Sequence, residues 1–224
     1  MPAISPTPFE NQLLDELQQA VVGSCARQSA LRDQYWQDLT KEERTPLAKA
    51  VGKRRREFAA GRRAAKQCAK RLGMPIEHLL IGTQREPCWP PSIKGTITHD
   101  ATSAFAWLVS SDHIRGLGLD VEKTSRLKRD TWRLLFTQPE LTLLQTSADP
   151  ELALTFFSAK ESVYKCLFPT VKRFVGYKEV CLQPSGTNQF RCVMNDSLAE
   201  ESGVDELSVY CLRSPSRLAT WTWL

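Results

Sequence analysis

The sequence predicts an α+β protein, because helical and strand patterns occupy different stretches of the chain. Residues 39–72 have the apolar spacing of a long helical region, and residues 151–168 have the spacing of a second helix. Alternating apolar and polar residues predict strands between 95 and 122, and again from 180 to 223. At 224 residues the chain can bury a full core, as one domain or as two closely packed halves.

The net charge of the chain is +5, which indicates an anionic partner. Nucleic acid, a phosphorylated small molecule and an acidic protein all fit this charge. The seven cysteines contain no Cys-x-x-Cys pair and only three histidines accompany them, which argues against a zinc site. We find no secretion signal and no apolar run of membrane-spanning length, so we expect a reduced, soluble, cytoplasmic protein without a membrane partner.

The helical region at residues 39–72 is strongly basic. Thr45 and Pro46 predict its N-cap and first turn, and Gly73 followed by Pro75 predicts its end. Its central basic residues are Lys53, Arg54, Arg55, Arg56, Arg62, Arg63, Lys66, Lys70 and Arg71. Such a run is most often a solvated basic face, and a nucleic-acid patch is the alternative at this level.

Three strands are predicted in the middle of the chain, at 95–99, 101–109 and 116–122. The last two are separated by a short polar turn, so we expect them to form a hairpin. His99 and Asp120 are then expected near adjacent ends of one sheet, as a shared site requires.

Residues 116–122 read Gly-Leu-Gly-Leu-Asp-Val-Glu. The alternation places Asp120 and Glu122 side by side on one face of the strand. Two adjacent carboxylates repel each other unless a cation lies between them, and Mg²⁺ is a hard cation that carboxylates and substrate phosphates bind together. Alone, an Asp-x-Glu at a strand end is usually a solvated edge.

Residues 157–165 read Phe-Ser-Ala-Lys-Glu-Ser-Val-Tyr-Lys and have helical spacing. Phe157, Glu161 and Lys165 recur every four residues and share one face, which brings an acid and an amine together. We expect Pro169 to end this helix. Alone, a Glu-to-Lys pair at this spacing is usually an ordinary surface pair.

Taken together and in this order, the two segments resemble the signature of the 4′-phosphopantetheinyl transferases. That family carries Gly-(Ile/Leu/Val)-Asp-x-Glu and, further along the chain, (Trp/Phe)-x-x-Lys-Glu-(Ala/Ser)-x-x-Lys. Gly118–Glu122 and Phe157–Lys165 fit this pattern position by position. Three more segments resemble the enterobactin-synthetase-component-D-like, or Sfp-type, branch of the family, and these are Lys53–Arg62, Arg85–Pro90 and Gly95–His99.

The resemblance implies a pseudo-twofold α+β fold of two similar halves, each with a mainly antiparallel sheet packed on a long helix. We expect the halves to be residues 1–114, with the coenzyme A contacts, and residues 115–224, with the metal-binding strand and the Lys-Glu helix. Thr96 departs from the family pattern, in which serine is commoner there. Ile81 also departs, because relatives can have a phosphate-binding lysine in that loop. Residues 1–40 match nothing in the pattern.

The family transfers the 4′-phosphopantetheine arm of coenzyme A to a serine of an acyl or peptidyl carrier protein and releases adenosine 3′,5′-bisphosphate. By resemblance, Asp120, Glu122 and Glu161 are expected to hold Mg²⁺, for which Mn²⁺ can substitute. Glu161 is also the expected general base for the serine. Lys165 is expected to stabilise the departing bisphosphate.

The resemblance also implies a set of coenzyme A contacts, namely Arg54, Arg62, Arg85, Thr98, His99 and Lys160. Arg54 and Arg62 are expected at the 3′-phosphate end, where the planar arginine fork suits a phosphate. Arg85 is expected to serve in place of the lysine absent at Ile81. Thr98, His99 and Lys160 are expected to hold phosphate oxygens.

The basic surface is expected to attract an acidic carrier protein, in an encounter that salt weakens. The motif order favours carriers of nonribosomal-peptide, polyketide or siderophore synthesis. Residues 132–136 and 141–144 predict two short helices around Pro139, which we interpret as a dock for the carrier. We expect a monomer, because one chain supplies both halves of the site.

Two alternatives come from other classes of protein. A Mg²⁺-dependent nuclease also uses clustered carboxylates and a lysine, and a non-catalytic module could bind nucleic acid through the basic helix. The nuclease gives the arginine helix, the Trp-Pro loop and the Thr-His strand no shared explanation, and the binding module would need none of Asp120, Glu122 and Glu161. We therefore expect no nucleic-acid partner.

Overall fold

The computed structural model describes residues 6–125 and 127–224. The chain divides into two compact units, which meet in sequence between Ile114 and Arg115. We call them the N-terminal unit and the C-terminal unit and describe each by itself. In each unit an antiparallel sheet packs on a helix of 20 residues, so the predicted α+β fold is confirmed.

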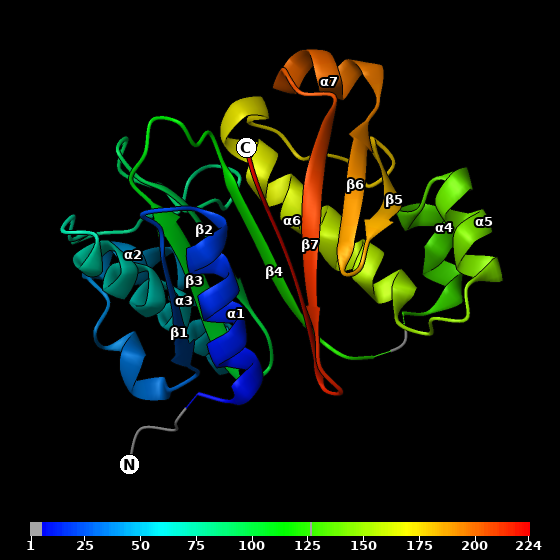
Figure 1. Ribbon diagram of the computed structural model, residues 1–224. Helices are drawn as coiled ribbons and strands as arrows, with labels where there is room; N and C mark the ends of the chain where they lie inside the picture. Colours follow the sequence, from blue (N-terminus) through cyan, green and yellow to red (C-terminus); the bar gives the residue numbers. More distant parts are fainter. Residues whose placement is uncertain (1–5, 126) are drawn as a thin grey trace. The chain divides into compact units, whose positions relative to one another are not determined.

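The sheet of the N-terminal unit has three antiparallel strands in the order β1-β3-β2 (Figure 1). The strands are β1 (Cys25–Ala30), β2 (Lys94–His99) and β3 (Ser103–Val109). One face of the sheet is covered by α1 (Pro8–Ala20), whose Glu10 meets Ser103. The other face is covered by α3 (Gly52–Arg71). The segment that matches no family pattern therefore supplies a helix and an edge strand.

Small residues on α3 let this helix lie close to the sheet. Ala60, Gly61, Ala64 and Ala65 are all buried. A Cβ atom added at Gly61 would lie 2.8 Å from the side chain of Ile97 on β2, so a larger residue would push the helix away from that strand. The small residues thus place α3 directly over the strand that ends in His99.

The start of α3 differs from the prediction. Thr40, rather than Thr45, caps a helix, because its hydroxyl accepts from the Glu43 N–H while the Glu43 carboxylate accepts from the Thr40 N–H. This reciprocal cap begins the short helix α2 (Lys41–Arg44). Thr45 and Pro46 fall in the 3₁₀ turn that follows, and α3 begins only after Val51.

The predicted hairpin between residues 101–109 and 116–122 is wrong. The strand β3 pairs with β1 and β2, whereas β4 (Leu117–Lys123) pairs with β8 (Arg217–Trp223) in the other unit. His99 and Asp120 therefore belong to different sheets.

The hairpin in this part of the chain is formed by β2 and β3. Oδ1 of Asp100 accepts from the backbone N–H groups of Thr102 and Ser103, which closes the turn between the two strands. This local bond favours pairing of β3 with the strand before it.

The sheet of the C-terminal unit has five antiparallel strands in the order β4-β8-β7-β6-β5. The remaining three are β5 (Val180–Gly186), β6 (Gln189–Met194) and β7 (Glu206–Arg213). The strands predicted in the last third of the chain are therefore present. First-to-last pairing of β4 with β8 brings residues about one hundred positions apart next to each other.

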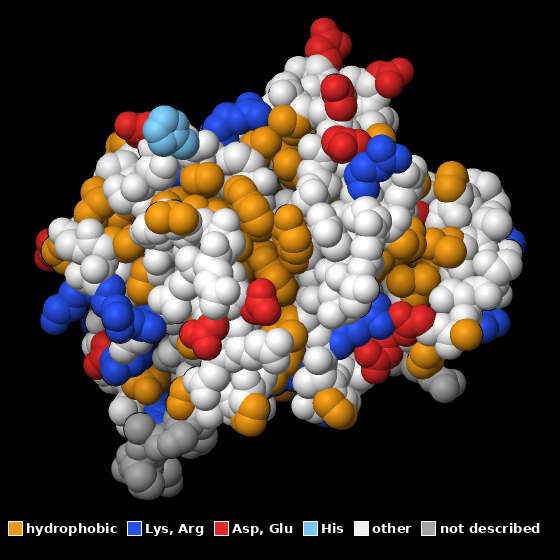
Figure 2. Space-filling model, in the orientation of Figure 1, with side chains coloured by type: hydrophobic (Ala, Val, Ile, Leu, Met, Phe, Trp, Pro, Cys, Tyr) orange, Lys and Arg blue, Asp and Glu red, His pale blue; other side chains and the backbone are white. Residues whose placement is uncertain are grey.

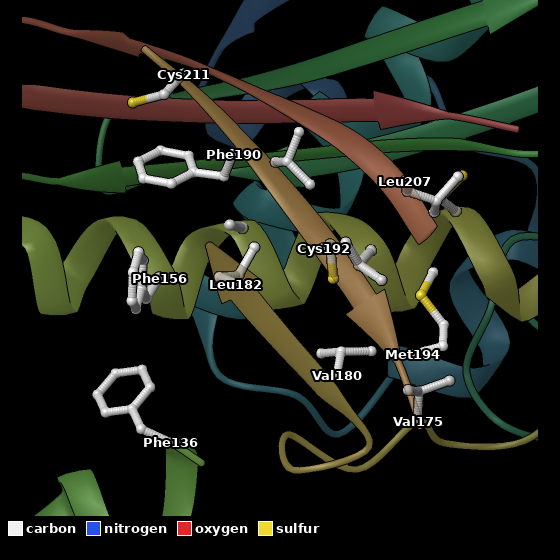
Figure 3. Close-up of a cluster of buried hydrophobic side chains, with 14 of the residues drawn as sticks. Phe136, Phe156, Val175, Val180, Leu182, Phe190, Cys192, Met194, Leu207 and Cys211 are labelled. Atoms are coloured by element: carbon white, nitrogen blue, oxygen red, sulfur yellow. The ribbon is translucent and has the colours of Figure 1, made fainter. Parts of the chain in front are cut away.

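Apolar side chains between α6 (Leu152–Val171) and the sheet form the core of this unit (Figure 3). Phe156 of α6 meets the rings of Phe136 and Phe190 edge to face, with centroids 6.3 and 5.6 Å apart. Leu182 and Cys192 fill the space beside them. The core fixes α6 against the sheet and with it every residue of the Lys-Glu segment.

The helix α6 does not end before Pro169, as the sequence pattern predicts. It continues to Val171, and Lys172 follows in the left-handed conformation with a φ of 53°. A proline in the last turn costs only one backbone hydrogen bond there, and burial of Phe168 and Val171 offsets this loss.

Three shorter helices complete the C-terminal unit, α4 (Trp132–Leu135), α5 (Gln138–Thr146) and α7 (Asp196–Ser202). The first two are the short helices predicted around Pro139, although this proline lies in the first turn of α5. Acidic side chains gather over α7 (Figure 2). Within the described residues, no helix is long and apolar enough to span a membrane.

Candidate active site

Gly116 and Gly118 allow α6 to approach β4 with almost nothing between the two backbones. A Cβ atom on Gly116 would lie 2.0 Å from the carbonyl oxygen of Cys166, and one on Gly118 would lie 1.9 Å from that of Ser162. Any larger residue would force the helix and the strand apart. The glycines of the first motif therefore bring it into direct contact with the second motif.

Asp120 is buried on β4 and is held from α6. Its Oδ1 accepts from the ammonium of Lys165 at 2.8 Å, and its Oδ2 accepts from the hydroxyl of Ser158 at 2.8 Å. Nζ of Lys165 also donates to the carbonyl oxygen of Leu119 at 3.0 Å. The carboxylate of Asp120 is thus oriented by two donors of the signature helix, and its charge is paired.

A chain of buried hydroxyls lies behind Ser158. Its Oγ is 2.9 Å from Oγ1 of Thr220 on β8, which in turn is 2.8 Å from Oγ of Ser162. Ser162 also donates to the carbonyl oxygen of Thr220 at 2.9 Å. Because all three side chains are fully buried and bonded to each other, the network can hold Asp120 in one orientation.

Glu161 is held by Tyr177. The phenol hydroxyl of Tyr177 donates to Oε1 of Glu161 at 2.5 Å. Burial raises the pKa of Tyr177 above its ordinary value of 10, and its hydrogen bond to Glu161 and the charges of Glu161 and Asp120 raise it further. Tyr177 therefore stays protonated at neutral pH and donates to the carboxylate of Glu161.

The carboxylates of Asp120, Glu122 and Glu161 have the oxygen chemistry that Mg²⁺ requires. Asp120 and Glu122 leave β4 on one face, and Glu161 belongs to the helix packed on that strand. In the part of the chain that the structure describes, no three acidic, histidine or cysteine side chains already surround one point. All three donors are carboxylates, so the donor set fits a hard cation, which would share Asp120 with Lys165.

Lys160 does not face this site, and the predicted phosphate contact disagrees with the structure. Its side chain is 1% exposed. The ammonium donates at 2.7 Å to Glu140 and also to three carbonyl oxygens, those of Leu135, Tyr177 and Val180. Burial lowers the pKa of Lys160, while Glu140 opposes the change. An ammonium has three hydrogens, and these acceptors use all of them.

In the N-terminal unit the structure brings together two predicted coenzyme contacts, Arg54 of α3 and His99 of β2. Nη1 of Arg54 lies 3.3 Å from Nε2 of His99. Because a guanidinium only donates, Nε2 is the acceptor in this contact. Glu57 lies 3.8 Å from each of them. The end of β2 therefore has a guanidinium, an imidazole and a carboxylate in one cluster.

Arg62 is buried in the same unit, with 6% of its surface exposed. Its Nε donates to the carbonyl oxygen of Leu79 at 3.2 Å, and its guanidinium lies 3.9 Å from the ring centre of Phe58. Burial lowers the pKa of Arg62 to about 10, which leaves it charged at neutral pH. Among the described residues Nη2 is buried without a hydrogen-bond partner, so an anion at this point would relieve a cost of about 1–3 kcal/mol.

Arg85 and Thr98 lie outside the cluster that Arg54 and His99 form. Arg85 is exposed at the tip of a turn, with a φ of 70°, and its N–H donates to Gly82 at 3.0 Å. Thr98 is buried next to His99 in β2, so the two side chains point to opposite faces of the sheet. Only His99 of this pair lies on the face that α3 covers.

Five residues of these clusters are additional to those predicted as site residues. Glu57, Ser158 and Ser162 lie inside the quoted motifs, and the spacing of three residues from Glu57 to Arg54 and from Ser158 to Glu161 could have suggested a role. Thr220 and Tyr177 carry no local signal. Only strand pairing brings Thr220 to Ser158, and only the path of the chain after α6 brings Tyr177 to Glu161.

Two protein-family models match the chain. Residues 42–109 match the 4′-phosphopantetheinyl transferase N-terminal domain. Residues 116–212 match the 4′-phosphopantetheinyl transferase superfamily. Together the two models span most of the chain, and they divide close to the boundary between the two units.

Curated proteins of the same kind are similar to this chain. The 4′-phosphopantetheinyl transferase PptT of Mycobacterium tuberculosis is 32% identical over 140 residues, which are 62% of this chain and 62% of that protein. The transferase Npt of Nocardia iowensis is 32% identical over 59% of this chain and 60% of its own. Enterobactin synthase component D of Salmonella austin is 38% identical over a segment that covers 53% of this chain and 50% of that protein. The chain thus spans between half and about three fifths of the curated relatives that it matches.

Proposed function

The chain belongs to the 4′-phosphopantetheinyl transferase superfamily, and on that premise we propose that it transfers the 4′-phosphopantetheine group of coenzyme A to a serine of an apo carrier protein. The products are the holo carrier protein and adenosine 3′,5′-bisphosphate. The observation that carries the proposal is the ion pair of Asp120 with Lys165 at 2.8 Å, at the contact of β4 with α6. It joins the two signature motifs in one strand-helix pair.

We assign the metal site to Asp120, Glu122 and Glu161, with Mg²⁺ as the ion and Mn²⁺ as its substitute. The bound ion supplies neutralisation of the negative charge that builds up on the diphosphate of the leaving group. The hydroxyl network of Ser158, Thr220 and Ser162 supports this assignment, because it holds Asp120 in a fixed orientation before any ligand binds.

The serine of the carrier protein is a weak nucleophile and loses a proton as its oxygen attacks the phosphorus next to the pantetheine arm. Glu161 accepts that proton, a contribution of about 10²–10⁴-fold to the rate. The bond from this phosphorus to the bridging oxygen breaks, and the bisphosphate leaves with the electron pair. Lys165, which lies against Asp120, stabilises the charge of the leaving group.

The N-terminal unit supplies the coenzyme A contacts in this proposal. Arg54 and His99 bind phosphate together, since they already lie 3.3 Å apart. Arg62 offers a buried nitrogen that has no acceptor among the described residues, and Arg54 lies on the same helix, so both arginines are assigned to the phosphates of coenzyme A. Arg85 is exposed and adds a further cation. We leave Lys160 out of the set because Glu140 and three carbonyl oxygens engage its ammonium, and Thr98 because its side chain lies on the face of the sheet opposite His99.

The partner in this proposal is an acidic acyl or peptidyl carrier protein, which the net charge of +5 attracts. A role in nonribosomal-peptide, polyketide or siderophore synthesis is supported by the similarity to enterobactin synthase component D. We also propose that the protein acts in the cytoplasm as a monomer. Sedimentation of a stable dimer would refute the last point.

The test is intact-mass spectrometry of several apo carrier proteins incubated with the protein, coenzyme A and Mg²⁺. We expect at least one carrier to gain one phosphopantetheine group, and EDTA to prevent the gain. Glu161→Gln is expected to lower the rate by about 10²–10⁴-fold. The exposed Glu200→Gln on α7 is the matched control and should keep the wild-type rate. If no carrier gains mass and coenzyme A does not bind, the proposed function is wrong.

A further inference from the structure

We propose that Tyr177 is a positioning residue for Glu161, whose Oε1 it holds so that Oε2 is presented to the serine of the carrier protein. The inference rests on the proposed function and deepens it. Tyr177 lies outside both signature motifs, sixteen positions beyond Glu161 along the chain.

The contact is short and specific. The hydroxyl of Tyr177 donates to Oε1 of Glu161 at 2.5 Å, which is typical of a hydroxyl bonded to a charged carboxylate. In the described part of the chain, Oε2 of Glu161 has no hydrogen-bond donor. The two oxygens therefore differ, because one is engaged by the protein and the other is available to accept a proton.

The ring of Tyr177 is held by aromatic neighbours. Its centroid lies 5.9 Å from that of Phe157 and 5.9 Å from that of Phe174. Phe157 lies one helical turn before Glu161 on α6, so ring and carboxylate share one face of the helix. Contact with two rings, one tilted and one edge to face, restricts the direction in which the hydroxyl can point.

The backbone around Tyr177 is also fixed. Nζ of Lys160 donates to the carbonyl oxygen of Tyr177 at 2.6 Å. Arg173 binds Glu179 and Glu201 through several hydrogen bonds of 2.6–3.1 Å, which ties both ends of the segment after α6. The adjacent residues Lys160 and Glu161 therefore both bind Tyr177, since the lysine holds its backbone and the glutamate accepts from its hydroxyl.

Loss of the hydroxyl should change the rate of the reaction and leave substrate binding unchanged. Without its donor, the side chain of Glu161 gains rotamers, and only some of them point an oxygen at the serine. We expect Tyr177→Phe to lower kcat about tenfold and to leave the KM for coenzyme A within about twofold. Tyr210→Phe removes the same atom from the stacked ring on β7 and is the matched control.

A double-variant comparison tests whether the effect passes through Glu161. In the Glu161→Gln background, Tyr177→Phe should have little further effect on kcat, because the group it positions is already lost. An unchanged kcat in Tyr177→Phe alone would overturn the proposal. A raised KM with an unchanged kcat would also overturn it, since the tyrosine would then be a substrate contact.

A second measurement reports the hydrogen bond without any turnover. The chain has four tyrosines, so labelling their Cζ atoms with ¹³C gives a simple spectrum in which Tyr177→Phe and Tyr210→Phe assign two signals. We expect Glu161→Gln to shift the Tyr177 signal and to leave that of Tyr210 in place. If the Tyr177 signal does not move, the proposal fails whatever the enzyme does. If it moves while Glu161→Gln transfers pantetheine at the wild-type rate, the bond exists and the proposed role of Glu161 as base is wrong.

Discussion

Each of the two units contains a glutamate–lysine pair of the same design, but the lysine is buried to a different extent. In each, a glutamate in the first turn of a short helix closes a capping box and also accepts from a lysine of the long helix. Glu43 of α2 binds Lys66 of α3, and Glu140 of α5 binds Lys160 of α6. Each glutamate further accepts one backbone N–H from elsewhere in its unit, that of Leu79 or of Leu182.

The difference between the two pairs is the exposure of the lysine. The side chain of Lys66 is 23% exposed, and Glu43 is its one acceptor among the described residues. The side chain of Lys160 is 1% exposed and binds three carbonyl oxygens in addition to Glu140. We call each glutamate–lysine pair a clamp. The Glu43–Lys66 clamp of the N-terminal unit has a lysine that reaches the surface, whereas the Glu140–Lys160 clamp is entirely internal.

Among the predictions, replacement of the two lysines should give the largest difference between the clamps in the free energy of unfolding. Lys160→Met leaves Glu140 buried without its cation, and we expect it to lower the free energy of unfolding by about 3–5 kcal/mol. Lys66→Met also leaves Glu43 buried, but the side chain of Lys66 is 23% exposed, so water can replace the lost donor there and the cost should be about 1–2 kcal/mol. Urea unfolding of both variants measures the difference.

The exposed Lys128→Met is the control for charge removal and should stay within about 0.5 kcal/mol of wild type. Equal losses in Lys160→Met and Lys66→Met would contradict the distinction between an internal and a surface clamp.

The long helices also differ in their cations. Lys160 and Lys165 of α6 pair with carboxylates inside the C-terminal unit, whereas α3 has arginines at its surface. We expect Arg54→Ala to weaken coenzyme A binding about tenfold, since it removes the cation beside His99. Arg56→Ala removes an equal charge from the same helix, where it pairs with Asp33 at 3.1 Å, and should change affinity little. Calorimetric titration without metal measures both. An equal loss in the two variants would mean that only net charge matters.

The sequence predicts the chemistry of the C-terminal unit better than its geometry. The motif order assigns Asp120 and Glu161 to a strand and a helix. Of the two glycines that allow β4 and α6 to touch, Gly118 is part of the motif and Gly116 lies two residues before it. The orientation of Lys160 could not be predicted, because it depends on Glu140 and on carbonyl groups that arrive from other segments. Neighbouring helix residues look equivalent until the packing around each is known.

Strand pairing is the other part that the sequence leaves open. Residues 101–109 and 116–122 have hairpin spacing, yet the second strand pairs with β8 near the end of the chain. Alternation predicts that a strand exists and which face is buried, but it does not identify the partner. Thr220 reaches Ser158 only through this distant pairing.

The clamp of the N-terminal unit also predicts a pH dependence of stability. Burial alone would raise the pKa of Glu43, but Lys66 and the N–H groups of Thr40 and Leu79 outweigh it, so the pKa lies below the ordinary value of 4.5. A carboxyl group whose pKa is lowered by folding stabilises the protein above its unfolded pKa. That stabilisation is lost as the pH falls through the folded-state pKa.

Glu43→Gln removes this contribution, and we expect it to lower the free energy of unfolding by about 1–3 kcal/mol at pH 7. The difference in the free energy of unfolding between wild type and variant should become smaller as the pH falls below 4.5, because Glu43 then becomes protonated and resembles the amide. Urea unfolding between pH 7 and pH 3 measures this difference. Glu77→Gln changes an exposed carboxylate of the same unit and should show no comparable difference in the free energy of unfolding at any pH. A difference for Glu43→Gln that stays constant with pH would mean that the ionised form of Glu43 does not stabilise the clamp.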